Sequence, residues 1–390
     1  MAEPSRPSKP SRRSAAELGA ALRESFNLQS ALVPIYAIVL ALAVAAVVIL
    51  LVGSNPIEAY WALLRGMFGT PDRVAASLGR STPFIGAALA VAFAFRAGLF
   101  NIGAEGQLLV GATAAAWVGT FSWVADVPAP IAIPIVIAAG ALGGAIYGGI
   151  PGVLKAKTGA HEVIVTIMLN NIAILIVRWL VNSQDPLILR DPGASVPRTS
   201  DLPDSARLPE VIATSPPMHL GFFFAITLCA VVWFILKRTT FGFAVRTVGT
   251  NPNAAKYAGM GVNRTIITVM ALSGAFAGLA GAGEITGTSG FLSPGVFVGI
   301  GFDAIAIALL ARANPFAIIL TSLLWGSMLS GAGLMQQESG LSIDAVRIVQ
   351  ALVLLFVAAD VIVRTLFRVR RTATTTLETT QVTSGWGGTT

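Results

Sequence analysis

The chain has 390 residues, of which 55% are hydrophobic and 12% are charged, and its formal net charge is +7. A soluble domain usually carries about 25% charged residues, so this composition excludes an ordinary globular enzyme and predicts that most of the chain lies in lipid. One cysteine and two histidines exclude an internal disulfide and a Cys/His metal cluster.

Ten apolar stretches are predicted to span a membrane, because a transmembrane helix needs about 20 apolar residues. They cover 31–53, 82–98, 106–125, 131–153, 162–182, 219–237, 265–286, 291–312, 315–334 and 345–366. Before them lies a polar tail, 1–30, and after them lies a Thr- and Gly-rich tail, 367–390, which we expect to be disordered. The fold class is therefore predicted to be all-α and polytopic, with one transmembrane domain over 31–366.

Lysine and arginine gather in four places that ten crossings put on one side of the membrane. These are the N-terminal tail, the connection after residue 153, the 238–264 loop and the C-terminal end. The positive-inside rule makes this side cytoplasmic, so both termini lie inside and the acidic 183–218 loop lies outside. The connection 56–80 has apolar residues at helical spacing, which predicts a helix along the membrane surface.

The segments repeat with an offset of about 184 residues, as from 82 to 265 and from 131 to 315. Each half, 31–182 and 219–366, has five crossings, and this odd number inverts the second half relative to the first. Inverted repeats are typical of transporters. Chance spacing of helices in a ten-span protein is the alternative.

Two glycine-rich interruptions occupy matching positions in these halves, at 96–107 and 284–290. The offset places Gly103 on Gly287 and Gly106 on Gly290. Irregular backbone at membrane depth is tolerated around a cavity or within protein, so the paired breaks indicate a substrate path. The alternative is a plain turn at each place.

Polar side chains at the breaks and inside the apolar segments are the candidates for lining this path. They are Asn101, Glu105, Gln107, Asn170, Asn171, Glu284 and Asp303. Neighbouring residues on a helix point about 100° apart, so Asn170 or Asn171 should face another helix or a pore; interhelical hydrogen bonding alone is the alternative. An amide-rich lining suits a neutral polyhydroxyl solute.

Two segments carry stripes of small residues at a four-residue spacing, which lets helices approach closely. They are Gly140, Gly144, Gly148 and Gly152 in one segment, and Gly274, Gly278 and Ala282 in the other. No catalytic constellation and no P-loop motif occur in the sequence. The chain is therefore predicted not to be an enzyme and not to bind ATP or another cofactor itself.

Residues 246–261 and the small-residue run 273–281 resemble the permeases of ribose-type and branched-chain amino-acid ABC importers. Residues 100–108 and 162–171 look more narrowly like the nucleoside, or simple-sugar, branch. The likeness covers about 30–366, but His161 stands where that branch often has Asn, and the 183–218 loop shows no family motif.

The resemblance implies a permease in a bacterial plasma membrane that passes nucleosides, or a related sugar-containing solute, inward by alternating access. It also implies three partners: a cytoplasmic ATPase that uses the ATP, a second permease subunit (related or identical) and an extracellular solute-binding lipoprotein. A permease for simple sugars or branched-chain amino acids, and a secondary transporter driven by an ion gradient, are the alternatives.

The resemblance further implies that the 238–264 loop holds a short coupling helix that docks into the ATPase. Asn251 suits an N-cap, Pro252 suits the first helical position, and Gly259 or Gly261 can end the helix. The residues assigned to coupling are Arg246, Gly249, Asn251, Pro252, Ala254, Ala255, Lys256 and Gly259. A basic loop that only sets topology is the alternative.

Overall fold

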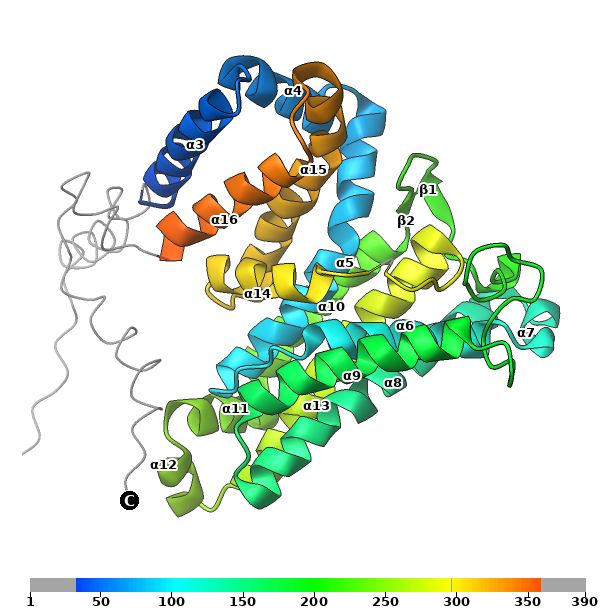
Figure 1. Cartoon of the computed structure of the whole chain (residues 1–390). Coiled ribbons are helices and arrows are strands. Elements are labelled where there is room, and N and C mark those ends of the chain that lie inside the picture. The colour runs from blue at the N-terminus through cyan, green and yellow to red at the C-terminus, as the bar shows by residue number, and fades with distance from the viewer. Residues whose placement is uncertain (1–32, 296, 359–390) are drawn as a thin grey trace, which may run out of the picture.

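The computed structural model describes residues 33–358 except residue 296, and this part of the chain is built almost entirely of helices (Figure 1). Both tails, 1–30 and 367–390, lie outside the described residues. The first half contains α3 (Val33–Leu51), α4 (Pro56–Phe68), α5 (Pro71–Arg96), α6 (Ala104–Gly119), α7 (Ser122–Asp126), α8 (Ala129–Thr158) and α9 (Glu162–Asn182).

The second half begins after a connection with a 3₁₀ turn, η1 (Asp204–Ala206), and an antiparallel hairpin of β1 (Glu210–Ile212) and β2 (Met218–His219). Its helices are α10 (Gly221–Arg238), α11 (Thr240–Thr250), α12 (Pro252–Tyr257), α13 (Val262–Glu284), the π turn η2 (Ile285–Ser289), α14 (Ile300–Leu310), α15 (Pro315–Ser339) and α16 (Asp344–Ala358).

Six of the described helices are long and apolar enough to cross a membrane: α5, α8, α9, α10, α13 with its π turn, and α15. The helices α3 and α4 add a seventh span if they count as one, bent by 118°. The expected span 291–312 contains only the 11-residue α14. The preceding residues do not continue a helix, because Gly295 and Gly299 have φ values of 93° and 99°, in the left-handed region.

The prediction of one surface helix over 56–80 is wrong in its extent. The helix α4 ends at Phe68, and α5 begins at Pro71, 11 residues before the expected start of that span. The physical reason is a local start signal: the Thr70 side chain accepts a hydrogen bond from the Arg73 N–H, and Pro71 occupies the first helical position.

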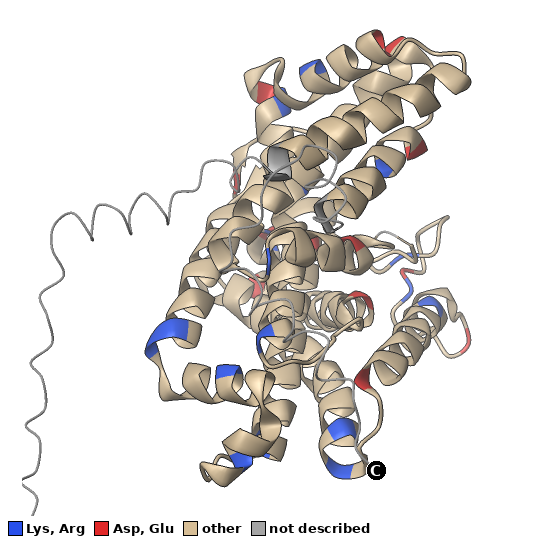
Figure 2. Cartoon of the chain, turned by 90° about the vertical axis from the view of Figure 1, so that its left-hand side faces the viewer, with Lys and Arg blue, Asp and Glu red and all other residues tan. Residues whose placement is uncertain are grey.

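Two groups of helices meet along α5 (Figure 1). The helices α4 and α5 pack against α15, and α3 packs against α16, whereas α6, α8 and α13 form the other group, with α9 on its outer side. Figure 2 shows several basic residues at the lower end of the molecule, where α11, α12 and the end of α8 lie in Figure 1.

The helices α8 and α13 approach each other along the predicted stripes of small residues. A Cβ atom on Gly144 would lie 2.2 Å from the Gly274 carbonyl oxygen, and one on Gly278 would lie 2.3 Å from that of Gly140. The predicted close approach is therefore confirmed. Because α8 belongs to the first half and α13 to the second, this contact joins the two halves.

Candidate functional site

The first break, which separates α5 from α6, is held together by buried amide side chains. Asn101 Nδ2 donates hydrogen bonds to Gln107 Oε1 (2.8 Å) and to Ser273 Oγ of α13 (2.7 Å). Asn101 Oδ1 accepts the Gly103 N–H at 3.0 Å. In this conformation the side-chain amides of Asn101 and Gln107, both predicted to line the path, therefore form hydrogen bonds within the protein.

The two adjacent asparagines of α9 point in different directions, as expected from the helix geometry. Asn170 is buried: its Oδ1 accepts the Gly106 N–H at 2.9 Å, and its Nδ2 donates to the Ile102 carbonyl oxygen at 2.9 Å. Asn171 is exposed, and its Nδ2 donates to the Ile167 carbonyl oxygen within α9 at 3.1 Å. Asn170 thus ties α9 to the first break, whereas Asn171 lies on the outer face of the helix.

Glu105 connects the beginning of α6 to the beginning of α14. Its Oε1 accepts the Gly299 N–H at 2.7 Å and its Oε2 accepts the Gly301 N–H at 2.6 Å. Helix N-termini carry unpaired N–H groups and a partial positive charge, so this buried carboxylate is stabilised by two helices at once. A Cβ atom on Gly301 would lie 2.2 Å from the Glu105 backbone nitrogen, so only glycine permits this approach.

Arg96, at the other side of the first break, holds the opposite end of α14. Its Nε donates to the Ala313 carbonyl oxygen at 3.0 Å, and its Nη2 donates to that of Arg312 at 3.4 Å. A cation at this end of a helix complements the partial negative charge of the last carbonyl groups. The two residues that flank the first break therefore hold α14 at both ends. No local sequence pattern indicates this role for Arg96.

The second break is a π turn, not an open loop. The helix α13 continues through Glu284 into Ile285–Ser289 and stops at Gly290, whose φ is 73°. Glu284 is partly exposed, and its neighbours include Thr288 and Arg80. Single π turns often occur at functional sites, so the predicted irregularity is present at this position.

The long 183–218 connection covers the second break and pairs its carbonyl groups. The N–H groups of Thr199, Leu202 and Leu208 donate to the carbonyl oxygens of Leu292 (2.9 Å), Gly290 (2.8 Å) and Thr286 (2.8 Å), respectively. Helix ends leave carbonyl groups without internal partners, so this connection completes the backbone hydrogen bonding of the break.

His219 of β2 packs directly against the π turn. Its Nδ1 accepts the Gly221 N–H at 3.2 Å, and a Cβ atom on Gly287 would lie 2.3 Å from its ring. Complete burial lowers the pKa of His219 to about 4, so the imidazole is neutral at pH 7. His219 was not among the predicted site residues, because nothing in its local sequence pattern distinguishes it.

A short helix, α12, lies where the sequence predicts the coupling helix. Asn251 is its N-cap, with Oδ1 accepting the Ala254 N–H at 3.0 Å, and Gly259 follows its end with a φ of 76°. Ala254 and Lys256 are exposed. Ala255 is completely buried against its own chain, so it is not available in this structure for the predicted contact with a partner.

Gly249, at the end of α11, brings α11 and the neighbouring α12 into contact with the first break. A Cβ atom on Gly249 would lie 2.4 Å from the Arg96 carbonyl oxygen and 2.9 Å from the Ala97 carbonyl carbon. Its hydrogen side chain therefore lets α11 touch the end of α5. Arg246, one turn earlier, is partly buried, and its Nε donates to the Gly242 carbonyl oxygen at 3.3 Å.

The structure brings together only part of the predicted path lining. Asn101, Glu105, Gln107 and Asn170 meet at the first break, and Asp303 of α14 lies close enough to Glu105 to interact with its charge. Glu284 lies at the other break, and Asn171 lies on the exposed face of α9. Among the described residues, no group of three His, Cys, Asp or Glu side chains is placed to hold a metal ion.

Comparison with known proteins gives consistent matches over most of the chain. The family model for the branched-chain amino acid transport system permease component matches residues 73–358. The chain is 43% identical to the guanosine ABC transporter permease protein NupP of Bacillus subtilis (strain 168), over 87% of this chain and 96% of that protein.

Two further relatives are similar to this chain at lower identity. The nucleoside ABC transporter permease protein NupB of Lactococcus lactis subsp. cremoris is 34% identical, over 85% of this chain and 92% of that protein. The glucose ABC transporter permease protein TsgB13 of Haloferax volcanii is 33% identical, over 83% of this chain and 86% of that protein. No solved structure matches the chain.

Proposed function

Because the chain belongs to the family of branched-chain amino acid transport system permease components, we propose that it is the subunit through which nucleosides enter the cell. It is the multi-pass membrane permease of an ABC importer and is not itself catalytic. This membership decides against the alternative of a secondary transporter driven by an ion gradient.

The solute assignment depends mainly on one observation, the 43% identity across almost the whole of a permease named for guanosine. A second relative named for nucleosides supports it, as does the likeness of residues 100–108 and 162–171 to the nucleoside branch. A simple sugar is the second candidate, because a relative named for glucose is 33% identical.

The solute path is proposed to run along the outer face of α9, between this chain and a second permease subunit. Asn101, Gln107 and Asn170 use their polar groups inside the protein, whereas Asn171 and Arg178 are exposed on α9. An amide and a cation facing lipid would be costly, so a second permease subunit, related or identical, is expected to cover this face. Hydroxyl groups of a passing solute would find hydrogen-bonding partners there.

The expected topology supports the same function. We propose two inverted halves, 31–182 and 219–366, with both termini cytoplasmic. Ten crossings then require that α14, which is too short to cross alone, makes the eighth crossing together with the irregular residues before it. Lys155 and Lys157 end α8 and Lys237 and Arg238 end α10, and the positive-inside rule favours one cytoplasmic side for these ends. The 183–218 connection then lies outside, where an extracellular solute-binding lipoprotein can reach it.

Transport is proposed to be driven through α12, which meets a cytoplasmic ATPase that uses the ATP. A movement of α12 and α11 would act on Arg96 and Ala97 through the close contact at Gly249. Arg96 and Glu105 hold α14 at both ends, so the first break and α14 would move together. The route thus leads from the ATPase side to the middle of the protein.

Uptake by the complete transporter, reconstituted in liposomes with its binding protein, tests the proposed solute. ATP-dependent uptake of radiolabelled guanosine is expected, and unlabelled adenosine should compete with it whereas a 100-fold excess of glucose should not. Uptake of radiolabelled glucose that nucleosides do not inhibit would reject the nucleoside assignment in favour of the sugar.

A further inference from the structure

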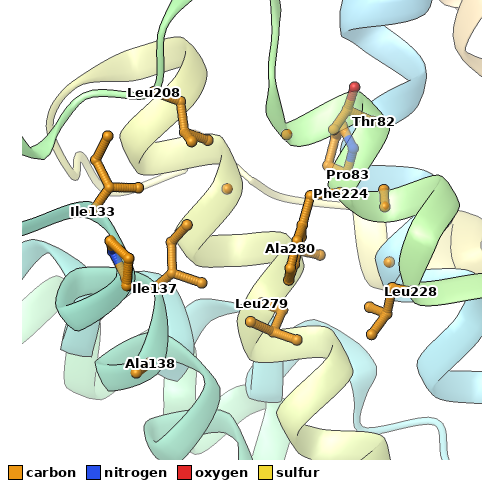
Figure 3. A pocket seen from close by; sticks show the side chains of 15 residues that line it. Thr82, Pro83, Ile133, Ile137, Ala138, Leu208, Phe224, Leu228, Leu279 and Ala280 are labelled. Carbon is orange, nitrogen blue, oxygen red and sulfur yellow. The ribbon is translucent and has the colours of Figure 1, made fainter. Parts of the chain in front are cut away.

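An apolar pocket of about 450 Å³ opens between α8 and α10, above α13 (Figure 3). The pocket lies near the 183–218 connection. Leu208 of that connection and Gly221, the first residue of α10, both contribute to its lining. Side chains from four helices form its walls and floor. They are Thr82 and Pro83 of α5, Ile137 and Ala138 of α8, Phe224 and Leu228 of α10, and Leu279 and Ala280 of α13.

The lining offers no free polar side chain to a ligand. Thr82 of α5 carries the one side-chain hydroxyl among the lining residues, and its Oγ1 donates to the Leu78 carbonyl oxygen at 3.1 Å within the same helix. Pro83 and Pro134 present rings and have no N–H to donate. Burying an unpaired hydroxyl costs roughly 2–7 kcal/mol, so a sugar or nucleoside would be rejected here.

Within residues 33–358, the part of the chain that the structure describes, no helix closes this space from the side. The helix α8 packs on α13 and α6, whereas α10 packs on α5, α11 and α15, so α8 and α10 have no extensive contact with each other across the pocket. Gly283 on that floor has room beside it, because a Cβ atom there would meet nothing within 4 Å. Ala138 and Phe224 on the walls are exposed to the surroundings of the helices, which in a membrane protein are hydrocarbon chains.

We propose that this pocket binds one acyl chain of a membrane phospholipid, from the leaflet on the side of the 183–218 connection. The lining of α10 extends from Gly221 to Leu228, which corresponds to a depth of about 10 Å at 1.5 Å per residue. A chain bound there separates α8 from α10 and contacts α13 next to the π turn. The inference depends on the membrane location and is independent of the solute.

The test uses the complete transporter in lipid nanodiscs that contain a phospholipid with a photoreactive diazirine in its acyl chain. After irradiation, mass spectrometry of peptides should find label on Leu279, Ala280 or Gly283, because these α13 residues face the pocket. Ala138→Trp fills the pocket from α8 and should reduce this label at least fivefold. Ile146→Trp is the matched control: Ile146 lies on the same helix, is 64% exposed and is not in the lining, so the α13 label should not change.

The proposal is overturned if α13 of the wild-type protein carries no label, or if Ala138→Trp is labelled as strongly as the wild type. Absence of label in the complete transporter would mean that protein, not lipid, covers the pocket. If Ala138→Trp does not elute as a monodisperse protein, Gly283→Leu replaces it, since it fills the same space from the floor. Guanosine uptake is not the readout, so failure of the proposed solute leaves this test intact.

Discussion

Buried polar side chains in this protein satisfy backbone groups that the breaks between helices leave open. Glu105 accepts two N–H groups at the start of α14, and Asn170 pairs with Gly106 and Ile102 at the start of α6. An unpaired backbone group in an apolar interior costs as much as a lost hydrogen bond. These side chains therefore make irregular backbone possible at membrane depth.

Glu105→Gln should lower the stability of the permease by about 1–3 kcal/mol. The amide keeps one acceptor oxygen but places an NH₂ group against an N–H of α14, and it removes the charge that two helix N-termini favour. Thermal unfolding of the purified protein measures the effect. Glu58→Gln, at an exposed position of α4, is the control. Equal melting temperatures for Glu105→Gln and the wild type would mean that this carboxylate does not hold α14.

Acid should weaken the contact between His219 and the π turn. Burial lowers the pKa of His219 to about 4, against about 6.5 when unfolded. The folded state therefore binds fewer protons than the unfolded state between these values. The free energy of unfolding is therefore higher above pH 6.5 than at pH 4, by about 3 kcal/mol. This difference is lost progressively as the pH falls from 6.5 toward 4.

Melting temperatures of the wild type and His219→Gln across pH 7.5 to 4 measure this effect. The wild type should lose more stability on acidification than the variant, which has no imidazole to protonate. Parallel curves for the two proteins would show that His219 does not titrate in this range.

At the scale of secondary-structure elements, α14 is the point where distant parts of the chain meet. It is too short to cross a membrane, and both of its ends are held by residues that flank the break between α5 and α6. The helix α11 touches the same break through Gly249. The contacts thus form a continuous physical connection from α12 to α14, along which energetic coupling can be carried.

Gly249→Ala tests this connection. The added methyl group would lie 2.4 Å from the Arg96 carbonyl oxygen, so α11 must move away from α5. We expect uptake to fall at least tenfold while ATP hydrolysis by the complete transporter continues. Gly261→Ala is the control, because its nearest contact would be 3.7 Å, an ordinary separation. Normal uptake by Gly249→Ala would argue against coupling through this contact.

At the scale of the whole molecule, the two halves are joined by the glycine contact of α8 with α13 and by the contacts of α14 with the first break. Close packing of backbones through small residues is one way in which membrane helices associate without a hydrophobic driving force. The pairing of first-half and second-half elements agrees with a transporter whose breaks lie near its middle.

Labelling of single cysteines with a membrane-impermeant maleimide tests the proposed orientation. In a Cys229→Ser background, a Ser200→Cys variant should react in intact cells, because residue 200 is exposed and lies in the connection that is proposed to be outside. An Asn253→Cys variant, in exposed α12, should react only after the cells are permeabilised. The opposite pattern would reverse the orientation, and reaction of both in intact cells would contradict a crossing by α10 between these two positions.

Several features followed from the sequence alone, because they depend on composition or on neighbours along the chain. Apolar length identified the long spans, the spacing of glycines predicted that α8 and α13 can approach other helices closely, and Asn251 with Pro252 predicted the start of α12. Family membership was likewise recognisable from short motifs. Each of these signals is local, so no knowledge of distant contacts was needed.

Only the tertiary structure decided which polar side chains form hydrogen bonds inside the protein and which are exposed. Glu105 pairs with Gly299, 194 positions away, and no local pattern reveals that partner. Burial of Ala255 and exposure of Asn171 likewise depend on how helices pack around them. The physical reason is that the free energy of a polar side chain in the membrane is set by its partners, and the fold chooses those partners from the whole chain.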